Sequence, residues 1–222
     1  MKKKILILIA AAVLLYLPRP AKALSLGTNS VGQQGGDFSL MFGIDYKMIQ
    51  VTDSGGRSAN MSTKGFSLTA RYNIISALSI FAYGGFSDIW LDNPNFQGYL
   101  GGSYGGGMRL SLPDPSKNPF TVNLVADASS TQSGNSARDV TDFEYGGAVY
   151  LAFKAGNSVT YGGVESSDAQ LSFTNPNHTY DSRYNVGAIF GMDQFIIPKL
   201  FFNFEAHVFD EDAVEGSIGY TF

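Results

Sequence analysis

Apolar and polar side chains alternate with a period of two residues through most of the chain after residue 37. In segment 38–48 the even positions are apolar, namely Phe38, Leu40, Phe42, Ile44, Tyr46 and Met48. The odd positions of the same segment include Ser39, Asp45 and Lys47. Successive side chains of a β-strand point to opposite faces, so the pattern predicts a strand with one apolar and one polar face.

Nine further segments repeat this scheme, more weakly in 78–90 and 158–172. The ten predicted strands are 38–48, 66–74, 78–90, 98–112, 119–129, 140–154, 158–172, 183–195, 199–209 and 213–222. Most have about the 9–11 residues that a tilted strand needs to cross a bilayer. No internal run of about 20 apolar residues occurs, which excludes helical spans after the N-terminus.

A membrane-spanning sheet must close, because an open edge would leave N–H and C=O groups unpaired in hydrocarbon. We therefore predict an all-β fold, a closed antiparallel transmembrane β-barrel of ten strands over residues 37–222, with eight strands as the alternative. The connections alternate in length. Polar, often longer connections are expected at 52–63, 91–97, 130–139, 173–182 and 210–212, and mostly tight turns at 75–77, 113–118, 155–157 and 196–198. Long outer loops and short inner turns are typical of outer-membrane barrels.

The N-terminus has the organisation of a secretory signal peptide. Lys2, Lys3 and Lys4 precede an apolar stretch from Ile5 to Leu17, and an A-x-A-like site ends at Ala23. We expect residues 1–23 to be removed and residues 24–36 to form a flexible lead-in. Residues 1–23 hold five of the 15 Lys and Arg and none of the 19 Asp and Glu, so the mature charge is −9. That balance disfavours nucleic acid as a partner.

The last strand ends on Phe222, and steps of two lead back to Tyr220, Ile218 and Val214. This pattern resembles the C-terminal assembly signal of bacterial outer-membrane β-barrel proteins, in particular the small OmpA-like and porin-like class, without pointing to a subfamily. The resemblance implies that Tyr220 and Phe222 are bound by the barrel-assembly machinery. It also implies an outer-membrane location, with membrane lipid around the barrel.

The inward faces of the predicted strands carry most of the ionisable residues. We expect a lumen charge network made of Asp45, Lys47, Arg71, Arg109, Asp127, Glu144, Lys154, Asp193, Glu205, His207 and Glu215. Arg71, Arg109, Lys154 and Asp193 are expected near the periplasmic end. Burial of unpaired charge is costly, so these groups must pair or stay hydrated. They form either a polar plug, which ten strands favour, or an acidic lining that passes cations.

The leading functional hypothesis is a non-enzymatic outer-membrane scaffold for surface interactions, or a narrow pore. An alternative is an outer-membrane hydrolase, because Glu205-x-His207 is the nearest approach to the Asp-x-His motif of the outer-membrane proteases that such barrels resemble. A third alternative is a soluble periplasmic ligand-binding barrel. We expect no cofactor: there is no Cys, and the glycine-rich run 101–107 lacks the ending of a phosphate loop.

Overall fold

The computed structural model describes residues 34–92, 95–174, 177–182, 186–209 and 211–222. The predicted signal peptide, residues 1–23, and residues 24–33 of the predicted lead-in lie outside the described residues. Within the described ranges, no helix is long and apolar enough to cross a membrane.

The strands, in chain order, are β1 (Phe38–Asp53), β2 (Ser58–Ile75), β3 (Leu78–Leu91), β4 (Phe96–Gln97), β5 (Gly101–Leu112), β6 (Phe120–Gly134), β7 (Asp139–Ala155), β8 (Ser158–Thr174), β9 (Asn177–Ser182), β10 (Gly187–Ile197), β11 (Leu200–Val208) and β12 (Glu211–Thr221).

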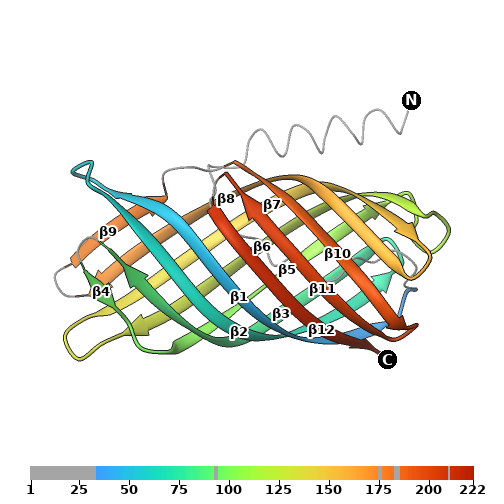
Figure 1. The fold of residues 1–222 in the computed structure, drawn as a ribbon, viewed down its shortest axis with the longest axis horizontal. Helices are drawn as coiled ribbons and strands as arrows, with labels where there is room; N and C mark the ends of the chain where they lie inside the picture. Colours follow the sequence, from blue (N-terminus) through green and yellow to red (C-terminus); the bar gives the residue numbers. More distant parts are fainter. Residues whose placement is uncertain (1–33, 93–94, 175–176, 183–185, 210) are drawn as a thin grey trace.

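These strands form one closed antiparallel barrel (Figure 1). Apart from β4–β5 and β9–β10, each strand pairs with the next along the chain, and β12 pairs with β1 to close the sheet. β4 and β5 both pair with β3, and β9 and β10 both pair with β8, so each of these couples occupies one position in the wall. The prediction of a ten-stranded closed barrel is therefore confirmed.

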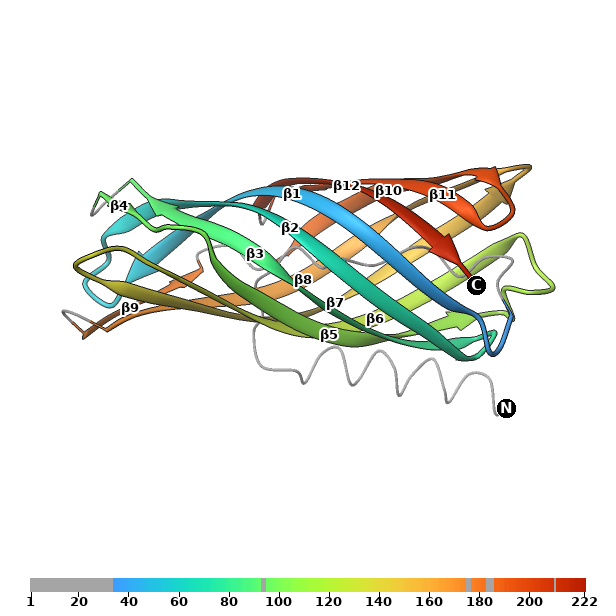
Figure 2. The same ribbon diagram turned by 90° about the horizontal axis from the view of Figure 1, so that it is seen from below.

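The two ends of the barrel differ. Tight turns occupy residues 76–77, 156–157 and 198–199 at the end where β1 begins and β12 finishes, as predicted. There Phe222 donates its backbone N–H to the carbonyl of Phe38, and their rings lie 5.8 Å apart. β4 and β9 lie at the opposite end (Figure 2). In outer-membrane barrels the tight turns are periplasmic, so β4 and β9 mark the outer end.

Beyond the β11–β12 hairpin the barrel continues with eight strands. This hairpin ends far short of the β1–β2 hairpin (Figure 1). Past it, Val51, Thr52 and Asp53 of β1 pair directly with residues 180–182 of β9. The wall is completed by β2, β3, β4, β6, β7 and β8, with a bridge from Tyr99 to Gly134 between β4 and β6. We call the described residues of 50–62, 89–99, 132–141 and 168–182 the outer extension.

This extension corrects the predicted connections. Most of the described residues within 52–63, 91–97, 130–139 and 173–182 are strand, and the β1–β2 and β6–β7 hairpins have only four residues between strands. The predicted loops are too long because the outward side chains of these segments are polar. In a strand that faces lipid, polar outward residues indicate that the strand has ended. The outer end is therefore a walled structure and not a set of long loops.

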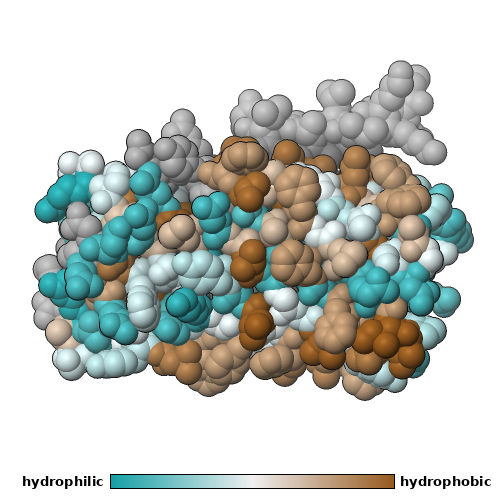
Figure 3. Space-filling view, viewed as in Figure 1, coloured by the Kyte–Doolittle hydropathy of each residue, from teal (hydrophilic) through white to brown (hydrophobic). Residues whose placement is uncertain are grey.

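Below the extension, large apolar side chains face outward. Phe42, Ile44 and Leu68 are 50%, 61% and 54% exposed. In Figure 3 the hydrophobic side chains gather over the middle and the periplasmic half of this face, and hydrophilic ones dominate the outer end. A soluble protein would bury such residues, so the hypothesis of a soluble ligand-binding barrel is wrong.

Candidate functional site: the polar lumen

The predicted lumen residues sit on the inward faces of their strands. Of the eleven, Asp45, Lys154 and Glu215 are half-buried, and the others are buried. The wall brings most of them into three groups, described below from the outer end inward. Lys154 joins none of these groups through a side-chain contact to a described residue. It lies at the periplasmic end of β7, as expected.

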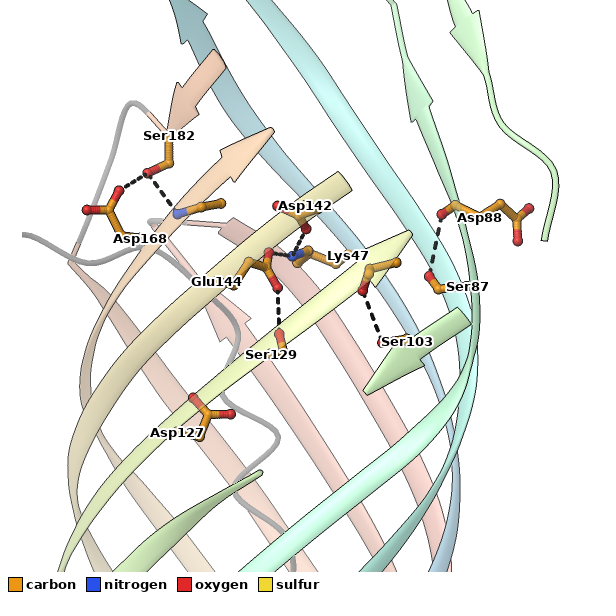
Figure 4. Close-up of polar contacts among 12 residues, drawn as sticks. Lys47, Ser87, Asp88, Ser103, Asp127, Ser129, Asp142, Glu144, Asp168 and Ser182 are labelled. Atoms are coloured by element: carbon orange, nitrogen blue, oxygen red, sulfur yellow. Dashed lines mark hydrogen bonds and ion pairs between the residues drawn. The ribbon is translucent and has the colours of Figure 1, made fainter. Parts of the chain in front are cut away.

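The first group is centred on Lys47. Its ammonium group forms an ion pair with Glu144 and lies 3.9 Å from Asp142 Oδ2 on the opposite side of the barrel (Figure 4). Ser129 donates a hydrogen bond to Glu144 Oε2 at 3.5 Å. β1 supplies the cation and β7 the two carboxylates, which are separated by one residue and therefore share a face. The contact crosses the lumen and ties the two walls together.

The second group is a hydrogen-bonded chain around His207. Nδ1 lies 2.9 Å from both carboxylate oxygens of Glu165, and Nε2 lies 3.0 Å from Glu205 Oε1. Tyr161 donates its hydroxyl proton to Glu205 Oε2 at 2.6 Å. A carboxylate can only accept, so this geometry suits an imidazolium ion that donates from both nitrogens.

The chain continues toward the periplasm. Asn203 donates to the Tyr161 hydroxyl at 2.9 Å and to Asp193 Oδ1 at 2.8 Å. A Cβ atom at position 191 would overlap the Tyr161 ring, so Gly191 provides the space in which that ring lies. Below this point the positive charges of Arg71 and Arg109 are close enough to repel each other, and the carboxylate of Asp193 offsets this repulsion at Arg71. These residues form the third group. Arg109 donates to the Tyr150 hydroxyl at 3.3 Å.

A cavity of about 80 Å³ lies between the first two groups. Asp45, Asp142, Glu144 and Glu215 line it, together with Lys47 and His207. Asp45 and Glu215 are direct cross-strand neighbours, and Glu215 is in turn opposite Glu205. This volume accommodates a few water molecules. Asp127, expected in the same region, accepts a hydrogen bond from the Tyr83 hydroxyl at 3.3 Å.

Apolar side chains fill the lumen on both sides of the cavity. Inside the outer extension and at its lower edge, where Ile49 lies, twelve buried residues form one cluster: Ile49, Val51, Ala59, Met61, Ile89, Leu91, Phe96, Val140, Ala169, Leu171, Phe173 and Tyr180. We call it the outer apolar cluster. A second cluster on the periplasmic side includes Phe81, Val125, Tyr150, Tyr161 and Ile189. The first group and His207 thus lie between two apolar layers, whereas Arg109 of the third group contacts Tyr150 of the second cluster.

Sequence analysis missed two buried acids of this site. Glu165, 2% exposed, lies on β8, whose weak alternation hid its inward position. Asp142, 1% exposed, lies two residues before Glu144 and shares its inward face, yet the predicted network does not include it. Glu165 could have been found from the odd positions of that strand, because Val159, Tyr161 and Leu171 share its parity and are buried with it.

The outer extension has polar contacts of its own. Asp53 accepts hydrogen bonds from the backbone and side chain of Arg57 and lies 3.2 Å from His178 Nε2. The backbone hydrogen bond from Arg57 lowers the pKa of Asp53, against the opposing effect of desolvation. On the outward face, desolvation raises the pKa of Asp168, which accepts a hydrogen bond from the Tyr145 hydroxyl.

Tyr220 and Phe222 lie on the outward, exposed face of β12 beside β1. This is the position that the resemblance to the assembly signal implies. The role of these two residues in assembly stays a prediction.

No protein-family model and no curated protein matches the chain. Among solved structures, an outer-membrane channel from Pseudomonas putida F1 is similar with a TM-score of 0.52 at 6% identity, over 88% of this chain and 99% of that one. OprG from Pseudomonas aeruginosa (TM-score 0.45, 11% identity, 86% and 98% covered) and the protease OmpT from Escherichia coli (0.45, 11%, 84% and 96%) also match. At these identities the likeness concerns the fold alone. Together with the exposed apolar belt, this fold is that of an outer-membrane β-barrel.

Proposed function

We propose that this protein is a closed, non-enzymatic outer-membrane scaffold, which acts through the surface of its outer extension and does not pass solutes through its lumen. The observation that carries the proposal is the outer apolar cluster. Any solute entering from outside would have to displace side chains such as Leu171 and Ile89, both of which are fully buried. Close-packed side chains leave no aqueous path.

The lumen charges also support a scaffold. Lys47 is shared by Glu144 and Asp142, and His207 is shared by Glu165 and Glu205. A pore selective for cations needs acidic groups that meet the passing ion. Here several of the acids instead contact basic groups from other strands and so brace the wall.

The same contacts argue against the hydrolase alternative. A general base needs a ring nitrogen that can accept a proton from water or from a nucleophile. Both nitrogens of His207 face carboxylate oxygens, and the side chain is 2% exposed. Glu205 itself accepts the proton of the Tyr161 hydroxyl. A role in holding strands β8 and β11 together accounts for the whole arrangement.

Conductance in planar bilayers tests the proposal. We expect the wild-type protein to give no stepwise conductance, because the outer apolar cluster blocks the lumen. A variant combining Met61→Ala, Leu171→Ala and Phe173→Ala should give small steps, and the control Phe143→Ala, on the outward face of β7, should stay silent. Stepwise conductance in the wild type that changes selectivity in Glu144→Gln would overturn the proposal in favour of the narrow pore.

A further inference from the structure

The outward face of β2 changes from polar to apolar at one residue. From the outer end its exposed face reads Ser58, Asn60, Ser62 and Lys64, and then Phe66, Leu68, Tyr72 and Ile74. The apolar part from Phe66 to Ile74 spans about the length that a tilted strand needs to cross the hydrocarbon. Lys64 therefore marks the height at which the lipid tails end and the headgroups of the outer leaflet begin.

Lys64 is held between two aromatic rings at this height. Its ammonium nitrogen lies 5.6 Å from the centroid of the Tyr46 ring and 5.3 Å from that of Trp90. Tyr46 is its cross-strand neighbour on β1, and Trp90 comes from β3. Phe66 and Phe86 lie next to each other just below, with ring centroids 5.5 Å apart. The rings hold the ammonium group over a firm apolar base at the edge of the membrane.

The charge of Lys64 is available to a ligand. Asp88 is directly opposite it on β3, yet no described carboxylate lies within ion-pair distance of the ammonium group. The other basic residues of the described strands are Lys47, Arg71, Arg109 and Lys154, which face the lumen. On the outward strand surface of the described chain, Lys64 is thus the single exposed Lys or Arg. Arg57 and Arg138 of the outer extension lie in its hairpin turns, and Arg57 is paired with Asp53.

We propose that Tyr46, Lys64 and Trp90 form a binding site for the phosphorylated sugar headgroup of an outer-leaflet glycolipid. Lys64 would donate to a phosphate oxygen, and the Trp90 and Tyr46 rings would pack against the sugar. Charge complementarity selects an anion, since an ammonium group is a strong phosphate donor. Continuity with the apolar belt selects a lipid, because the acyl chains of the same molecule would cover Phe66 and Phe86 directly below.

The test uses the full chain in detergent micelles, with the binding of bisphosphorylated lipid A measured by native mass spectrometry. We expect Lys64→Gln to weaken binding about tenfold, the effect of losing one hydrogen bond to a charged group. Lys64→Arg should retain binding, because the positive charge is kept. Lys117→Gln is the control, since Lys117 is also an exposed lysine but lies in the β5–β6 turn at the periplasmic end. Heat-modifiable gel migration would verify that each variant is folded.

Three further arms decide the ligand. Lipid A without its phosphates should bind the wild type as weakly as the phosphorylated form binds Lys64→Gln, and Trp90→Ala should lower affinity for the phosphorylated form. Inorganic phosphate should not displace the lipid; full displacement would show a simple anion site and overturn the proposal. Equal binding by wild type and Lys64→Gln would overturn it as well, without bearing on whether the lumen is closed.

Discussion

The membrane-spanning part and the outer extension are built from the same strands with opposite polarity. On β2, Phe66 and Leu68 face outward in the membrane-spanning part, where Ser67 faces the lumen. In the extension, Ser58 and Asn60 face outward, and Ala59 and Met61 are buried inside. The backbone pairing continues without interruption between the two. The polarity of a strand face therefore reports the surrounding medium, lipid or water, and not the architecture.

The two parts are consequently stabilised by different interactions. In water the extension gains from burying its twelve-residue apolar cluster, as a soluble barrel does. In the membrane, outward apolar side chains contact lipid both in the folded barrel and in a membrane-bound unfolded chain. Their contribution to the free energy of folding is therefore small. What remains in that part is the backbone ladder, the paired charges of the lumen and the apolar cluster on the periplasmic side of the lumen.

The two histidines of the chain provide the most sensitive test of this contrast. His207→Ala would leave Glu165 and Glu205 buried without their cation, and we expect a loss of about 3–5 kcal/mol of unfolding free energy. His178→Ala, in the extension, removes a partly exposed contact to Asp53 that Arg57 also makes, so its cost should stay below about 1 kcal/mol. Denaturant unfolding in detergent micelles measures both. Equal losses of unfolding free energy in the two variants would show that the paired lumen charges do not stabilise the membrane-spanning part.

A second comparison places the same residue on the two outward faces of β2. Leu68→Arg puts a charge into the hydrocarbon and should destabilise the barrel by about 2–4 kcal/mol. Ser58→Arg, on the same face in the extension, enters water and should change stability by no more than about 0.5 kcal/mol. Unfolding from lipid vesicles gives both values. A large cost at position 58 would mean that the membrane reaches further up the strand than its side chains indicate.

The membrane-spanning part could be predicted from the sequence because lipid imposes a one-sided pattern. Outward apolar residues such as Phe42, Leu68 and Ile218 belong to series that recur at every second position of their strands. This pattern was sufficient to predict ten strands and a closed barrel. The extension was hidden because its pattern has the reverse polarity. Ile49 and Val51, like Ala59 and Met61, are two residues apart and inward, but the polar residues between them are typical of loops.

The lumen site could be predicted only in composition. Parity along each strand placed Lys47, Glu144, Glu205 and His207 inside. Which of them meet depends on strand tilt and on the distance across the barrel, which no local pattern contains. The contact of Lys47 with Glu144 spans 97 positions of the chain, and that of His207 with Glu165 spans 42. Glu165 itself was missed because the inward positions of β8 change from apolar at Tyr161 to polar at Glu165 and back to apolar at Leu171.

The smallest expected effect concerns pH, and it contrasts the turns at the two ends. Hydrogen bonds from Ser116 and Ser76 lower the pKa of Asp114, in the periplasmic β5–β6 turn, to about 2, and Arg57 lowers that of Asp53 in the extension. A depressed carboxyl pKa stabilises the folded state above the pKa of the unfolded chain, and that contribution is lost as the pH falls through the folded pKa. The thermal midpoint should therefore decline as the pH falls from about 4 to about 2, and the midpoint of Asp114→Asn should decline less.

Asp53→Asn should weaken the acid dependence of a different process, the local opening of the outer extension. Site-resolved proteolysis of the β1–β2 hairpin can follow that opening separately. Identical acid limbs in the wild type and both variants would show that neither turn is held by its carboxylate.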